Sequence, residues 1–373
     1  MFTREKLEAL RARYAGAGAG DVQDPEFRKV SEMLFAGTDR RKLPYAGVKT
    51  FLDAPWRDAA AGAAPMDDLD AVLVGIPMDL GVTNRSGARL GPRAVRAVER
   101  IGPYNHVLRI APLAAMSVAD IGDVPFSSRY SLEDSARDIE ASYDRIVAAG
   151  ALPFGVGGDH SVSYPILRAL GRGRPVGMVH IDAHCDTGGP FEGSKFHHGG
   201  PFRQAVLDGV LDPERTIQVG IRGSAEFLWE FSYASGMTVI HAEEVTEMGV
   251  RAVVAKAREV IGDGPTYLSF DVDGLDPAFA PGTGTPEAGG LSARGPRHPA
   301  RHGRRQHRRR RRRRGRAAIR PEHEHRAGRG AGAVRDGERR GARPAPQASP
   351  PLTAGRAARR ARVASALRRV GAA

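Results

Sequence analysis

The sequence has little of the chemistry that stabilises secreted or membrane-spanning proteins. It contains one cysteine, Cys185, so no disulfide can form within the chain. No apolar run approaches the roughly 20 residues needed to span a membrane. The amino terminus carries charges at Arg4, Glu5 and Lys6, where a signal peptide needs an apolar stretch. These absences predict a soluble, cytoplasmic protein with no membrane partner.

Lysine, asparagine, methionine and all aromatic residues are absent after Ser292. The formal net charge of +13 therefore combines two unlike parts. Residues 293–373 contain 26 Arg and four acids, a net charge of +22, whereas residues 1–292 contain 30 basic and 39 acidic residues, a net charge of −9. A tail of Arg, Ala, Gly and Pro cannot form a core. We therefore predict an N-terminal arm (1–68), a folded domain (69–292) and a disordered tail (293–373).

Short runs rich in β-branched residues alternate with longer amphipathic segments through the folded domain. They predict strands at residues 71–76, 116–121, 152–156, 176–181, 216–221, 237–240 and 266–272. The longer segments predict helices at 131–149 and 243–261, and two further amphipathic stretches precede the domain at 4–14 and 26–35. This alternation predicts a three-layer α/β/α domain with a mainly parallel sheet and a site at the carboxyl ends of its strands.

Acidic and histidine residues follow three of the predicted strands, in the segments 157–161, 182–186 and 269–273. In an extended chain, residues two apart face the same side, so Asp182 with His184, and Asp271 with Asp273, point into one site. Each segment alone is also compatible with a turn or a solvated loop. Together, four carboxylates and two imidazoles require cations. A pair of divalent ions that ionise a water is the simplest arrangement, and oxygen-rich ligands favour Mn²⁺ over Zn²⁺.

These residues resemble the ureohydrolases, a family that includes agmatinase, arginase and guanidinobutyrase. The similarity runs from about Leu73 to Ser292. It rests on Gly-Gly-Asp-His-Ser from Gly157, Asp-Ala-His-Cys-Asp from Asp182, and the long segment that begins Ser-Phe-Asp-Val-Asp-Gly-Leu-Asp-Pro at Ser269. Earlier signatures of the family are Gly-Ile-Pro-Met-Asp from Gly75 and Gly-Ala-Arg-Leu-Gly-Pro from Gly87.

The resemblance implies a homo-oligomeric enzyme with two Mn²⁺ ions that releases urea from a guanidino compound. One ion would be held by His160, Asp182, Asp186 and Asp271, and the other by Asp182, His184, Asp271 and Asp273. In this scheme Asp186 orients the attacking hydroxide and Glu287 pairs with the substrate guanidinium. His198 resembles the histidine that shuttles a proton to the leaving amine, although the family more often has Thr where this chain has Gly200.

The substrate predicted from the resemblance is agmatine, which would give urea and putrescine. Segment 188–196 lacks the Ser-Gly-Asn element with which arginases bind the amino-acid head group. Guanidinobutyrase and guanidinopropionase share nearly all of the quoted motifs, so a guanidino acid is the alternative substrate.

The arginine-rich tail allows two interpretations. Seven consecutive arginines, Arg308 to Arg314, are typical of a segment that binds nucleic acid non-specifically. A different class of protein, a nucleic-acid-binding chain on an inactive scaffold, would follow from that interpretation. The other is a shifted reading frame beginning near Ser292 to Arg294. Arginine codons of the form CGN, read one base later before another C, encode only Val, Ala, Asp or Gly.

The same shift applied from Arg314 to Ala327 permits Glu-Val-Ala-Pro-Gln-Tyr-Asp-Pro-Ser-Thr-Asn-Thr-Ala, which resembles the terminal strand of the ureohydrolases and the start of the following helix. We therefore prefer the shifted frame. It predicts that the last strand and helices of the domain are missing, that apolar surface is left uncovered, and that the product is impaired or inactive although the motifs are complete.

Overall fold

The computed structural model describes residues 2–18, 21–35, 46–98, 104–105 and 111–293. Apart from Ala293, the predicted tail lies outside the described residues. None of the helices within these ranges has the length and apolar character to cross a membrane. All seven predicted strands are present, six of them with small shifts at their ends and β5 with an earlier start, and every pairing between them is parallel. The predicted α/β class is therefore confirmed.

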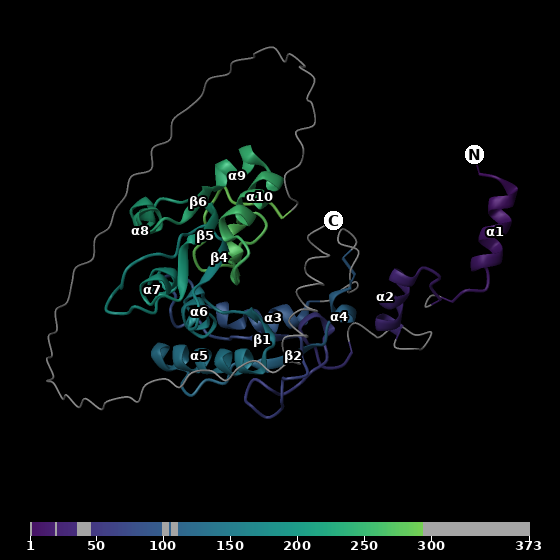
Figure 1. The fold of residues 1–373 in the computed structure, drawn as a ribbon, viewed down its shortest axis with the longest axis horizontal. Helices are drawn as coiled ribbons and strands as arrows, with labels where there is room; N and C mark the ends of the chain where they lie inside the picture. The colour runs from purple at the N-terminus through teal and green to yellow at the C-terminus, as the bar shows by residue number, and fades with distance from the viewer. Residues whose placement is uncertain (1, 19–20, 36–45, 99–103, 106–110, 294–373) are drawn as a thin grey trace, which may run out of the picture. The chain divides into compact units, whose positions relative to one another are not determined.

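The first sheet has three strands in the order β2-β1-β3, of which β1 and β2 are labelled in Figure 1. Their bounds are β1 Ala71–Gly75, β2 Val118–Asp123 and β3 Leu152–Val156. The central strand β1 is buried along its whole length, as expected of a parallel strand covered on both faces.

The second sheet has four strands in the order β6-β5-β4-β7. Their bounds are β4 Val176–Ile181, β5 Leu211–Ile221, β6 Thr238–His241 and β7 Thr266–Phe270. The strand β5 begins well before the predicted start at Thr216, because Leu211 already pairs with Val176 ahead of a shift in register.

The described ranges also contain ten α-helices, which are labelled in Figure 1. They are α1 Arg4–Tyr14, α2 Pro25–Phe35, α3 Gly91–Ala97, α4 Pro112–Ala115, α5 Leu132–Ala149, α6 Ser163–Gly171, α7 Pro201–Leu207, α8 Glu230–Ser235, α9 Ala242–Met248 and α10 Val250–Ile261. Helix α5 shows why the predicted boundaries were close. Its first turn is capped by the Ser131 hydroxyl, which accepts a hydrogen bond from the Asp134 amide, and it ends at Gly150 in the left-handed conformation.

The single helix predicted over residues 243–261 is wrong at one point. Gly249 adopts φ +77° and ψ 155°, so the segment divides there into α9 and α10. The apolar periodicity continues across the break and therefore did not reveal it. Glycine permits this backbone conformation at little steric cost.

Helix α6 contacts the hydrophobic cores of both sheets. Ile166 belongs to the cluster formed with β1 and β2, whereas Tyr164 and Leu167 belong to the cluster that includes Met178 of β4. Tyr267 of β7 packs against both clusters. The two sheets are thus joined by side chains of one helix and one strand.

The strands β3 and β7 are each paired on one edge only among the described residues. Both expose large apolar side chains: Leu152 is 40% exposed and Phe154 49%, and on β7 Leu268 is 67% exposed and Phe270 52%. Parallel strands are normally buried on both faces. These two edges are therefore unusual for the class of fold to which they belong.

Candidate metal centre

The candidate site is built from the three loops that follow β3, β4 and β7. Each loop begins where a strand ends, so their side chains meet at one edge of the sheets. The loop after β3 can turn here only because residue 158 is glycine, since a Cβ atom at Gly158 would lie 1.6 Å from the Met78 carbonyl oxygen. Asp159 then accepts hydrogen bonds from the Gly81 and Ser161 amides and fixes the position of His160.

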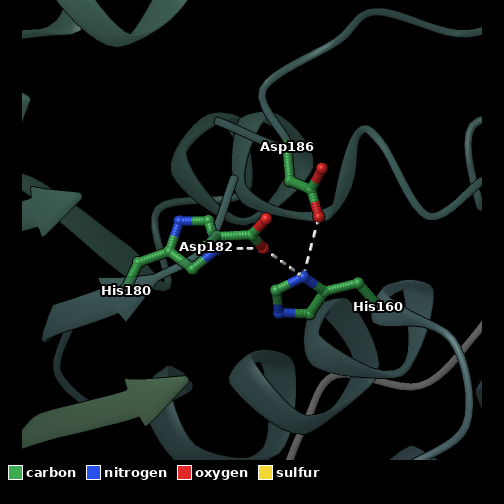
Figure 2. A group of neighbouring side chains, drawn as sticks. All are labelled: His160, His180, Asp182 and Asp186. Atoms are coloured by element: carbon green, nitrogen blue, oxygen red, sulfur yellow. Dashed lines mark hydrogen bonds and ion pairs between the residues drawn. The ribbon is translucent and has the colours of Figure 1, made fainter. Parts of the chain in front are cut away.

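The first group of donors surrounds the buried imidazole of His160. Its Nδ1 atom lies 3.0 Å from Oδ2 of Asp182, 2.8 Å from Oδ2 of Asp186 and 3.4 Å from Oδ2 of Asp271. Figure 2 shows the carboxylates of Asp182 and Asp186 converging on this atom. Despite these short distances, Nδ1 has no partner with hydrogen-bond geometry. A buried nitrogen that faces three carboxylate oxygens without a hydrogen bond fits a cation ligand.

The second group of donors is centred on His184. Its Nδ1 atom lies 3.2 Å from Oδ2 of Asp273 and 3.5 Å from Oδ1 of Asp182. The carboxylate of Asp182 therefore belongs to both groups. The His184 side chain is 27% exposed, whereas that of His160 is 8% exposed. The second group is the more open of the two.

Backbone geometry also marks the site. Asp186 has φ +52°, in the left-handed region that residues other than glycine seldom adopt. Such strained conformations cluster at functional sites, where surrounding contacts hold them in place. This conformation directs the Asp186 carboxylate to His160.

The charges of the cluster strongly perturb one another. Burial acts to raise the pKa of Asp182, but the surrounding imidazoles hold it well below its usual range. Burial, with the neighbouring carboxylates of Asp182 and Asp273, raises the pKa of Asp271 to about 7. Burial together with Asp182 raises the pKa of Asp273 to about 6. Although burial opposes its charged form, nearby carboxylates raise the pKa of His184 to about 11. Without a cation, the raised pKa values of Asp271, Asp273 and His184 favour bound protons, whereas Asp182 stays ionised.

His180 was missed in the sequence, although it lies two residues before Asp182 on β4 and so faces the same side. It is fully buried, and its Nε2 atom lies 2.7 Å from Oδ2 of Asp182 (Figure 2). The Gln218 side-chain nitrogen donates to the Cys185 carbonyl oxygen and also approaches Nδ1 of His180 at 3.0 Å. This places the His180 ring proton on Nε2. His180 therefore donates to Asp182 and has no free nitrogen for a cation.

The two remaining predicted site residues lie beside this cluster. Glu287 places Oε1 3.8 Å from Nε2 of His184, at the open group. His198 is held by the loop after β1: its amide donates to the Gly81 carbonyl oxygen, and its Nε2 atom lies 2.7 Å from Oγ1 of Thr83. Thr83 is a second residue that the sequence motifs did not reveal.

The six predicted ligands are thus brought together, in two groups that share Asp182. A parallel α/β domain with such a cluster of carboxylates and imidazoles at its strand ends defines the class of metal-dependent hydrolases. Within that class, residues 69–301 match the arginase family, and the chain belongs to this family. It is an enzyme that hydrolyses the C–N bonds of guanidino and other amidine groups.

Individual members of the family and their structures are similar to this chain. The chain is 51% identical over 261 residues to a guanidinopropionase of Pseudomonas aeruginosa, which covers 68% of this chain and 80% of that protein. It is 46% identical over 250 residues to the mitochondrial agmatinase of Gallus gallus, covering 66% and 72% of the two chains. Its structure is similar to that of Trypanosoma cruzi formiminoglutamase with Mn²⁺, with a TM-score of 0.56, 29% identity and coverage of 65% and 83%.

Proposed function

We propose that this chain is a dinuclear manganese hydrolase that cleaves a guanidino compound to urea and an amine. The observation that carries the proposal is the position of Asp182 between two histidine-containing donor groups. A shared carboxylate is the arrangement expected where two cations lie a few ångströms apart. The first ion would be held by His160, Asp182, Asp186 and Asp271, and the second by Asp182, His184, Asp271 and Asp273.

Divalent ions held by these ligands would lower the pKa of a water molecule and so supply the nucleophile. The Asp186 carboxylate accepts a hydrogen bond from the attacking water and orients it. The Glu287 carboxylate, next to His184, pairs with the planar guanidinium through two parallel hydrogen bonds. His198 gives a proton to the leaving amine, with its ring oriented by the Thr83 hydroxyl.

Agmatine is the substrate we propose first, because segment 188–196 lacks the arginase head-group element. A guanidino acid is the second candidate, favoured by the 51% identity to a guanidinopropionase. The test is urea release from agmatine, 4-guanidinobutyrate, 3-guanidinopropionate and arginine in the presence of Mn²⁺. We expect kcat/KM for one of the first three to exceed that for arginine. A higher value for arginine, or urea release that is independent of metal, would contradict the proposal.

We further propose that the frame of the gene is shifted near Ser292. The exposed apolar edges of β3 and β7 support this, because within the part of the chain that the structure describes each lacks on one side the neighbour that a parallel strand needs. Resequencing the gene gives the first test. The second compares urea release by this chain and by a frame-corrected chain, for which we expect higher activity and homo-oligomers in light scattering. Equal activity of the two chains would refute the impairment.

A further inference from the structure

Arg222 is a buried cation at the candidate site for which the mechanism above has no role. It follows the end of β5, its amide donates to the Ala183 carbonyl oxygen, and it is 8% exposed. Burial lowers the pKa of its guanidinium, and among the described residues no carboxylate forms an ion pair with it. An unpaired buried charge is costly unless hydrogen bonds satisfy it. The charge of Arg222 therefore has to be satisfied by hydrogen bonds.

Backbone carbonyl groups take the place of a carboxylate. The guanidinium donates to six of them, those of Gly220, Asp273, Gly274, Leu275, Glu287 and Ala288. The two shortest of these bonds, each 2.7 Å, go to the carbonyl oxygens of Asp273 and Glu287. Arg222 thus ties the loop after β7 to the segment that carries Glu287.

Gly223 completes this arrangement. It has φ +93°, and a Cβ atom there would lie 3.0 Å from the carboxyl carbon of Glu287. The Glu287 carboxylate therefore lies directly against Gly223, between this residue and His184. Arginine holds the backbone of Glu287, and glycine leaves room for its side chain.

We infer that Arg222 and Gly223 form a cradle that positions the Glu287 carboxylate and thereby sets the affinity for the guanidino group of the substrate. The inference rests on the proposed function, in which Glu287 binds that group. Arg222 is a positioning residue and does not bind the tail of a guanidino acid, because its guanidinium N–H groups are already directed at carbonyl oxygens.

The first test replaces Arg222 and uses Arg215 as its matched control. Arg215 lies within β5, and its guanidinium is likewise held by backbone carbonyls, those of Ile261 and Pro265. Hydrogen exchange is measured on residues 285–291 of the full chain, without metal or substrate. We expect Arg222→Met to accelerate exchange about tenfold or more, Arg222→Lys to give an intermediate rate, and Arg215→Met to leave these residues unchanged.

This exchange measurement does not depend on catalysis, so it separates the inference from the proposed function. Absence of urea release by the frame-corrected chain with all four guanidino compounds would refute the function and leave the exchange result standing. Unchanged exchange in Arg222→Met, or equal acceleration by Arg215→Met, would overturn the cradle even in an active enzyme.

The second test uses Gly223→Ala, with Gly62→Ala as control. Both glycines have positive φ, but a Cβ atom at Gly62 meets no atom within 4 Å. With Mn²⁺ present, we expect Gly223→Ala to raise KM for the fastest substrate about tenfold, with kcat and Mn²⁺ stoichiometry nearly unchanged. Gly62→Ala introduces the same strain of an alanine at positive φ but creates no contact with Glu287, so we expect it to leave KM unchanged. Equal KM values for the two variants would overturn the role of Gly223.

Discussion

The two donor groups of the site differ in how they meet solvent. The His160 group is closed: its imidazole is buried and packs against the rings of His180 and Phe202. The His184 group is open, with a partly exposed imidazole beside Glu287. Asp182 is common to both. From this difference we expect the closed group to bind its cation more tightly and the open group to face the substrate.

The largest effect is expected from Asp182→Asn, which changes both groups at once. An amide cannot supply the charge that two cations share, so we expect loss of both ions. The fall in activity should be larger than the 10–100-fold that is typical when a residue hydrogen-bonded to a metal ligand is replaced. Bound manganese is counted by atomic absorption, and urea release is measured in parallel. Retention of two ions would show that Asp182 is not shared.

A smaller effect is expected at His180, mainly in the closed group, because His180 contacts Oδ2 of Asp182, the oxygen that faces His160. Replacement by Phe removes the proton donor to Asp182 and should weaken Mn²⁺ binding about 10–100-fold. The control is His180→Gln, whose side-chain nitrogen can still donate. Titration calorimetry measures the Mn²⁺ affinity of each of the two sites. Weaker binding at the open group alone would contradict the assignment of His180 to the closed group.

pH tests the open group through its perturbed carboxylates. The pKa of Asp273 is raised to about 6, that of Asp271 to about 7 and that of His184 to about 11, so protons on all three groups compete with the cation. Apparent Mn²⁺ affinity should therefore rise with pH through 6 and 7 and continue to rise above 7, by about tenfold per unit for each displaced proton. Calorimetry in buffers of different ionisation enthalpy counts these protons, and pH-independent affinity would contradict the assignment.

The smallest effect is expected at Thr83. Thr83→Val removes the hydroxyl that holds Nε2 of His198 and leaves both donor groups intact. We expect kcat to fall about tenfold or less, with Mn²⁺ binding unchanged. Thr83→Ser, which keeps the hydroxyl, is the control, and altered metal content in Thr83→Val would argue against a role limited to the histidine.

The sequence predicted local features well. The strands are short apolar runs, and Asp182 with His184, and Asp271 with Asp273, lie in one site as predicted. The reason differs from the alternation of an extended chain, because residues 182–184 form a bend after β4 and Asp271 caps the 3₁₀ turn Val272–Gly274. His180 obeys the same spacing but lies inside an apolar run, where a histidine has no distinctive pattern. Its role depends on Gln218, a residue of the neighbouring strand.

Features that depend on distant partners could not be predicted in this way. The contacts of Arg222 join the end of β5 to segments 51 to 66 residues further along the chain, and no sequence periodicity indicates them. The division into two sheets depends on which strands pair with which. The apolar pattern of β3 or β7 indicates that the strand is buried, but it does not identify the neighbouring strands. The break at Gly249 is a single backbone conformation inside an otherwise continuous helical pattern.

The open edges of β3 and β7 also bear on the behaviour of this chain in a cell. Among residues 2–293 with their undescribed gaps, no strand pairs with the outer edge of either, and exposed Phe and Leu side chains flank both edges. Natural proteins avoid this combination because it allows a second chain to pair there. We expect the protein to self-associate at these edges as its concentration rises. Expression yield and colloidal stability would then be limited by two strands outside the metal centre.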